Sequence, residues 1–370
     1  MPQRSRLMLL AVVVGLVAVR VGVYAQAPAV KSPLPQPNPF KMDESFKLEM
    51  PQGLKTLGSV SAVKVGPDNN LYVFHRCVDN SCTGHNDLNP ILIYNQQGKL
   101  LRQMGAGQFV WPHGLQVMPD LSLWVTDAVA PDGVDKNNPG KGHQVFHLDK
   151  NGKVLLALGK PGVAGAGHDT FNAPSDVLIG KNGDIFVADG HGMGTGTRVV
   201  KFNSKGEYIK EWGGKGAGPG QFEVPHAAAM DSQGRIFVAD RPNNRIEIFD
   251  QDGKLLAEWR QFGRPSGIAI DRNDNMYVTD TQTTQGRTGF ENGIYIGSAK
   301  DGRVTGFIPK IREHSTWEGN VPGGGGNASG VATNMEAIAV TPDGNTIYGG
   351  EVGLMNVFKF VRTDRARSTK

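Results

Sequence analysis

Two histidines and one glutamate occupy equivalent places in a pattern that recurs along the chain. His113 is the second residue of the segment PHGLQV, His226 of PHAAAM and Glu336 of MEAIAV. The copies in between carry serine at this place, namely Ser61, Ser175 and Ser266. Two imidazoles and a carboxylate that converge with open positions are typical of a catalytic site for zinc or a similar divalent metal. We predict these three residues as metal ligands, the alternative being a polar, water-filled channel.

Three further side chains stand where a second strand of the pattern ends. Arg76 follows LYVFH, His191 follows VADG and Arg241 follows VAD. Two arginines beside a metal would suit a substrate that bears a carboxylate, because a guanidinium binds a carboxylate through two charged hydrogen bonds. A surface salt bridge is the alternative role for each of them.

The pattern behind these residues is a repeat with starts near 57, 110, 172, 223, 264 and 334. Each copy has a short apolar strand, a turn rich in Asp, Asn and Gly, and a second strand. Two more strands follow in all but the last copy. In the four clearest copies the second strand ends in aspartate: Asp127, Asp189, Asp240 and Asp280.

Six units of four antiparallel strands predict an all-β fold, a six-bladed β-propeller. The last unit has only three strands, so we expect the segment FKLEM at 46–50 to supply its outer strand and close the ring. A two-layer sandwich would give no reason for a phased repeat. In a propeller the first strand of every unit lines the central channel, which would bring His113, His226 and Glu336 to one point on the axis.

The composition agrees with many short strands and tight turns. The 370 residues include 50 glycines and 22 prolines, yet 39% of the chain is hydrophobic, which argues against disorder and against a helical bundle. The net charge is +4 and no basic block stands out, so we expect no nucleic-acid partner.

The N-terminus predicts export. Arg4 and Arg6 precede an apolar run at 7–19, and cleavage after Ala25 would fit a secretory signal peptide; an uncleaved anchor is the alternative. We therefore expect a secreted or periplasmic protein without a membrane span after cleavage, and a monomer. The predicted divisions are a signal peptide at 1–25, a Pro-rich tether at 26–45, the propeller at 46–363 and a tail at 364–370.

The two cysteines, Cys77 and Cys82, lie close together in a polar segment. In an oxidising compartment they would pair as a disulfide, and otherwise they are two free thiols.

Over residues 57–363 the chain resembles an NHL-repeat propeller, and more specifically the peptidyl-α-hydroxyglycine α-amidating lyase family. In that family three histidines from alternate blades hold a catalytic zinc. PHGL, VPHA and NMEAI stand at the matching places, so the resemblance implies His113 and His226 as ligands, with Glu336 in place of the third histidine. The family's active-site arginines are matched by Arg76, within FHR, and Arg241, within VADR.

Two positions depart from the family. His191 stands in the place of the catalytic tyrosine. A structural calcium of the family uses two main-chain carbonyls, matched at Val63 and Leu115, and an aspartate whose place Ala337 takes. The resemblance thus implies zinc more strongly than calcium.

The resemblance implies cleavage of the C–N bond of an α-hydroxyglycine amide to an amide and glyoxylate. Arg76 and Arg241 would hold the carboxylate, and His191 would accept the proton. Two other functions stay open: a different metal-dependent hydrolase or lactonase on the same fold, and a non-catalytic NHL-repeat binding module.

Overall fold

The computed structural model describes residues 31–128, 140–191, 196–283, 289–310 and 335–364. The predicted signal peptide at 1–25 and all but the first residue of the predicted tail lie outside these residues. Within them every regular element is a β-strand, and no helix that could span a membrane is found.

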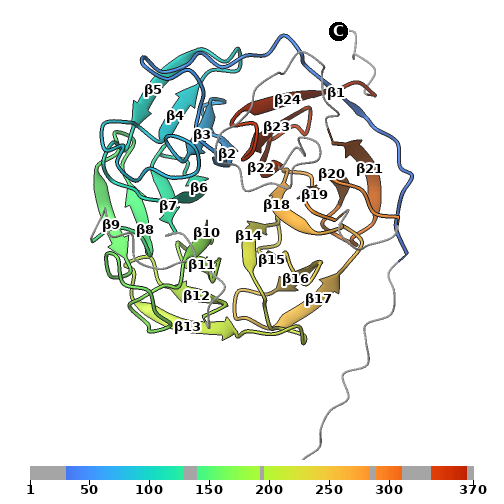
Figure 1. Ribbon diagram of the computed structural model, residues 1–370. Helices are drawn as coiled ribbons and strands as arrows, with labels where there is room; N and C mark the ends of the chain where they lie inside the picture. Colours follow the sequence, from blue (N-terminus) through green and yellow to red (C-terminus); the bar gives the residue numbers. More distant parts are fainter. Residues whose placement is uncertain (1–30, 129–139, 192–195, 284–288, 311–334, 365–370) are drawn as a thin grey trace, which may run out of the picture.

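Six four-stranded antiparallel sheets are arranged around a central axis, which confirms the predicted six-bladed β-propeller (Figure 1). Blade one consists of β2 (Val60–Val65), β3 (Leu71–His75), β4 (Ile91–Tyr94) and β5 (Leu100–Met104). Blade two consists of β6 (Pro112–Val117), β7 (Leu123–Asp127), β8 (Gln144–Leu148) and β9 (Val154–Leu158). Blade three consists of β10 (Pro174–Ile179), β11 (Ile185–Asp189), β12 (Arg198–Phe202) and β13 (Tyr208–Gly213). Blade four consists of β14 (Pro225–Met230), β15 (Ile236–Asp240), β16 (Arg245–Phe249) and β17 (Leu255–Trp259). Blade five consists of β18 (Pro265–Ile270), β19 (Asn275–Asp280), β20 (Gly293–Ser298) and β21 (Val304–Pro309). Blade six consists of β22 (Met335–Val340), β23 (Thr346–Glu351), β24 (Val357–Arg362) and β1 (Phe40–Met42).

An N-terminal strand closes the ring, as predicted, but it is a different segment. Phe40–Met42 pairs with β24, whereas 46–50 forms no strand. Phe46 and Leu48 instead pack on the core between blades six and one, beside Tyr348. The alternation of apolar residues in FKLEM therefore reflects packing rather than pairing, and the propeller begins at Phe40 instead of residue 46.

Burial decreases from the axis to the rim of each blade. All five residues of β11 and of β15 are buried, because both faces of a blade pack against neighbouring blades. The outer strand β13 alternates between half-buried and exposed residues. The hydrophobic core is accordingly divided into clusters between adjacent blades rather than gathered in one centre.

The repeated aspartates fix the segment that leads into each inner strand. Asp127 accepts hydrogen bonds from the backbone N–H groups of Val110 and Trp111, at 3.0 and 2.7 Å. Asp189, Asp240 and Asp280 accept equivalent bonds in their own blades. Each carboxylate therefore satisfies buried donors that no strand can pair.

Every inner strand begins with a break in register where the candidate ligands lie. The pairing of β6 with β7 shifts between Pro112 and Leu115, and that of β14 with β15 between Pro225 and Ala227. The same irregularity lies between Met335 and Ala337 in blade six. Because a β-bulge re-aims the side chain at the break, it sets where His113, His226 and Glu336 point.

Candidate active site

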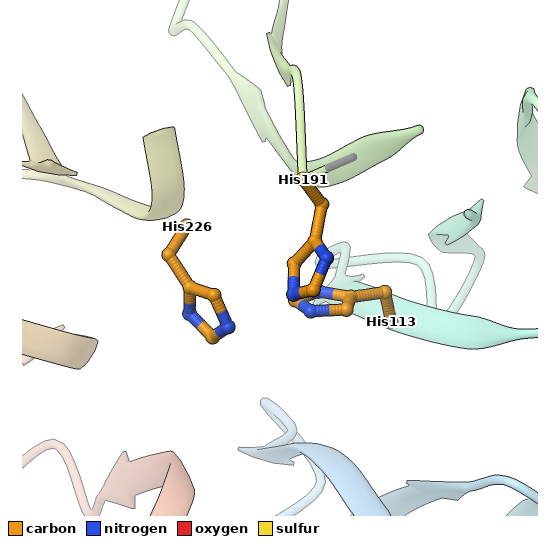
Figure 2. A group of neighbouring side chains, drawn as sticks. All are labelled: His113, His191 and His226. Carbon is orange, nitrogen blue, oxygen red and sulfur yellow. The ribbon is translucent and has the colours of Figure 1, made fainter. Parts of the chain in front are cut away.

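Three imidazoles meet at one end of the channel. The rings of His113, His191 and His226 have centroids 4.6, 4.9 and 5.0 Å apart in pairs (Figure 2). One ring nitrogen from each lies within 4.8 Å of the other two, and in the described part of the chain these three residues form the candidate metal-binding group. From the sequence, His113 and His226 were expected to meet on the axis, and His191 was expected at the rim of the same cavity.

Hydrogen bonds orient two of these rings. The Nδ1 of His113 lies 2.6 Å from the carbonyl oxygen of Ser175, and the Nδ1 of His226 lies 2.7 Å from that of Ser266. Since a carbonyl only accepts, each Nδ1 carries the hydrogen and each Nε2 keeps a free lone pair. The serines at the alternate positions of the repeat thus orient the histidines through their backbones.

Burial also keeps these imidazoles neutral. Desolvation lowers the pKa of His113, His191 and His226 well below the ordinary 6.5, and the nearby Arg76 and Arg241 charges lower it further. A neutral imidazole is the form that binds a metal. The Nε2 atoms of His113 and His226 and both ring nitrogens of His191 are buried, with no hydrogen-bond partner among the described residues.

His191 reaches the group from the turn after β11. Gly190 precedes it with φ of +124°, and a Cβ there would lie 2.8 Å from the Cα of Thr197. The backbone N–H of His191 donates to the carbonyl of Ala173 at 3.0 Å. Glycine at 190 is therefore required for the turn that directs His191 to the axis.

The other predicted residues lie directly beside the imidazoles. Glu336 Oε1 is 3.1 Å from Arg241 Nη1, and its Oε2 is 4.0 Å from Arg76 Nη2 and 3.9 Å from His226 Nε2. Burial lowers the pKa of Arg76 to about 10; Glu336 opposes this shift and Arg241 adds to it. All six residues proposed from the sequence therefore converge.

Three contributors were missed by the sequence reasoning. The ring of Trp111 stacks on the Arg76 guanidinium, 3.7 Å from its centroid, and contacts His191 with centroids 4.9 Å apart. Asn80 Oδ1 accepts a hydrogen bond from Arg76 Nη1 at 2.5 Å. Burial lowers the pKa of Arg264, and the nearby Arg241 charge lowers it further. Trp111 and Arg264 both directly precede the proline that begins an inner strand. This position in the repeat is the signal by which the sequence could have identified them as site residues.

The loop that carries Asn80 is closed by a disulfide between Cys77 and Cys82. Of the two alternatives left open by the sequence, a disulfide or two free thiols, the structure has the disulfide. The loop directly follows Arg76, so the disulfide restricts the segment that caps the guanidinium.

The arginines retain buried donors without an acceptor. Arg76 Nη2, Arg241 Nε and Arg264 Nε make no hydrogen bond within the part of the chain that the structure describes. Buried donors in native proteins are almost always paired, so these N–H groups call for an acceptor from a ligand or solvent. An anionic ligand satisfies both the donors and the excess positive charge.

The residues fit a metal ion. Zinc–nitrogen bonds of about 2.0–2.1 Å at tetrahedral angles place two ligand nitrogens about 3.4 Å apart. The imidazole nitrogens lie within 4.8 Å of one another, so pairs of them need to approach by at most about 1.4 Å to bind one ion. Four ring nitrogens without partners in a buried site also supply the lone pairs that such an ion needs.

Below the imidazoles the inner strands line a cavity of about 30 Å³, enough for one or two waters. Val63, Leu115 and Ala337, the positions matched to the calcium site, line it together with Lys64 and Asp176. Burial raises the pKa of Asp176, and the Lys64 ammonium lowers it. The ammonium group of Lys64 thus already places a positive charge beside these positions. Calcium binding stays a prediction.

Comparison with known proteins agrees with this architecture. The NHL repeat family model matches residues 222–249, which span β14–β16. A gluconolactonase structure from Xanthomonas campestris aligns with a TM-score of 0.54 and 13% identity, covering 92% of this chain and 99% of that one. The protein is thus a six-bladed β-propeller in which residues 222–249 match the NHL repeat.

The relatives found by sequence include amidating enzymes. The chain is 28% identical over 367 residues to peptidylglycine alpha-amidating monooxygenase of Rattus norvegicus, covering 90% of this chain and 33% of the relative. It is 28% identical over 345 residues to peptidyl-alpha-hydroxyglycine alpha-amidating lyase 1 of Drosophila melanogaster, covering 84% of this chain and 58% of the relative. The resemblance predicted from the sequence is confirmed, and the chain spans about a third of the length of the rat protein.

Proposed function

We propose that the protein is a metal-dependent lyase that cleaves the C–N bond of an α-hydroxyglycine amide to give an amide and glyoxylate. The observation that carries this proposal is the pairing of two features in one buried site. A group of neutral imidazoles, each with at least one ring nitrogen that has no partner among the described residues, lies beside guanidinium N–H groups that lack acceptors there. The first suits a metal, and the second suits a substrate carboxylate.

The residues divide between these two tasks. His113 and His226 would hold the metal, with Glu336, as the sequence predicts, or His191 at the third position. A divalent metal bound there would act as a Lewis acid toward the substrate hydroxyl oxygen. Arg76 and Arg241 would bind and orient the substrate carboxylate, and Trp111 holds Arg76 in place. A proton released from the hydroxyl would pass to His191 or Glu336, whichever is not bound to the metal. As the hydroxyl oxygen becomes the carbonyl of glyoxylate, the C–N bond would break and the same residue would return the proton to the amide nitrogen.

The direct assay is glyoxylate release from α-hydroxyhippurate by the zinc-loaded protein. We expect turnover by the wild type and at least about 100-fold loss in His113→Ala, because ligands on a metal act as a unit. His147→Gln is the matched control, since His147 lies in β8 away from the axis. No glyoxylate from the fully loaded wild type would exclude the lyase, and turnover of a lactone instead would favour the alternative hydrolase.

Export is a second part of the proposal. We propose that residues 1–25 are removed and that the remaining chain functions as a secreted or periplasmic monomer. N-terminal sequencing of the protein recovered from its native host is expected to begin at Gln26. A chain that still begins with Met1 in the membrane fraction would favour the uncleaved anchor.

A further inference from the structure

The two candidates for the third metal ligand, His191 and Glu336, differ in their surroundings. His191 lies among the imidazoles, with its ring 4.6 Å from that of His113 and 5.0 Å from that of His226. Glu336 lies at the edge of the group, where its shortest contact is to Arg241 at 3.1 Å. The geometry of the group therefore favours the histidine.

His191 has no other partner for its polar atoms within the described residues. There, both ring nitrogens are buried and neither makes a hydrogen bond, whereas His113 and His226 each donate one to a backbone carbonyl. A buried polar atom without a partner is destabilising, and natural sites rarely keep two on one ring. A metal ion at the centre of the group would satisfy one nitrogen of His191 and the free Nε2 of both neighbours.

Glu336, by contrast, already forms ion pairs with two arginines. It is the carboxylate placed between Arg76 and Arg241, 4.0 and 3.1 Å from their nearest nitrogens. Moving it onto a metal would leave the buried guanidinium of Arg76 and the half-buried guanidinium of Arg241 without the anion that now lies between them. Removing one partner of a buried ion pair is strongly destabilising.

We propose that His113, His191 and His226 are the three nitrogen ligands of the metal, and that Glu336 is a positioning residue that holds Arg76 and Arg241. This proposal rests on the metal of the proposed function and assigns its ligand set. It puts His191 in the place of Glu336 as the third ligand that the sequence pattern predicted. The ligands then come from three consecutive blades, two, three and four, instead of from alternate ones.

Zinc X-ray absorption of the wild-type protein tests this without any substitution, because imidazole ligands give a distinctive scattering pattern that can be counted. We expect three imidazoles per zinc. Two imidazoles with a carboxylate would overturn the proposal, and so would a wild-type protein that binds no zinc.

Variants give an independent measurement. His191→Gln is expected to show two imidazoles and at least about 100-fold weaker zinc binding, because loss of a direct ligand exceeds the 10–100-fold cost of losing an outer partner. Glu336→Gln is expected to keep three imidazoles, with zinc binding about tenfold weaker since a nearby negative charge is lost. His147→Gln is expected to match the wild type.

An unchanged imidazole count in His191→Gln would contradict the assignment. Circular dichroism of each metal-free variant confirms that it is folded before its metal is counted. The result is separable from the lyase assay: three imidazoles without glyoxylate release would exclude the lyase and leave the ligand set standing.

Discussion

At the scale of single residues, the site is defined by which charged groups have partners and which do not. Glu336 is shared by two arginines, yet three guanidinium nitrogens around it still lack acceptors. An internal carboxylate therefore occupies part of the surface that would bind the carboxylate of a substrate. Substrate and Glu336 are expected to compete for Arg241.

This competition makes a prediction for Glu336→Gln. We expect the metal-free variant to bind glyoxylate about tenfold more tightly than the wild type, because a neutral amide competes less well for a guanidinium than a carboxylate does. Titration calorimetry measures the dissociation constants, with Glu207→Gln as a control on an exposed turn. Equal or weaker binding by Glu336→Gln would mean that the arginines do not receive the ligand.

Sequence reasoning found six residues of the site but not all of their neighbours. The repeat put His113, His226 and Glu336 in phase, and the strand ends located Arg76, His191 and Arg241. Which atoms meet depends on the bulges and on the turn at Gly190, which side-chain alternation does not reveal. Trp111 was missed because an apolar residue before a strand is more often core than site.

At the scale of elements, the turn after the second strand of each blade decides what reaches the axis. Arg76 and Arg241 directly follow this strand. Each donates its backbone N–H to the carbonyl of the residue directly before the inner strand, as does Gly190 in blade three. His191 lies one residue further along. The left-handed conformation of Gly190 makes this difference possible.

Gly190→Ala is therefore expected to displace His191. An added Cβ would meet the Thr197 Cα at 2.8 Å and be strained at a φ of +124°, which costs about 1–3 kcal/mol of stability. We expect weaker zinc binding together with a lower free energy of unfolding, measured by dye competition and urea denaturation.

Gly214→Ala provides the matched control. Its φ is +120°, but a Cβ there meets no atom within 4 Å. The control is expected to lose some stability from backbone strain while retaining zinc affinity. If both variants bind zinc like the wild type, the turn does not set the position of His191.

At the scale of the whole molecule, stability depends on closing the ring. The period of the repeat was sufficient to predict six blades, because each unit buries its faces only against neighbours. It did not identify the closing strand, since β1 has only three residues and lies in a proline-rich stretch. Its pairing with β24 is a long-range contact that local pattern does not specify.

Truncation tests this closure. A chain lacking residues 1–43 loses β1 and the buried Phe40, so β24 becomes an exposed edge. We expect its melting temperature to fall by at least about 5 °C relative to a chain lacking residues 1–30, since burying one large side chain contributes about 1.5–3 kcal/mol. Equal melting temperatures would show that 40–42 is dispensable.

The central claim is that the three converging histidines hold a metal, and the metal content of the purified protein tests it most directly. Inductively coupled plasma mass spectrometry of the wild type, dialysed after incubation with zinc, is predicted to give close to one zinc per chain. His226→Ala, treated in the same way, is predicted to give less than about a tenth of that amount. A wild type without bound zinc, or a His226→Ala variant with the same zinc content, would contradict the account.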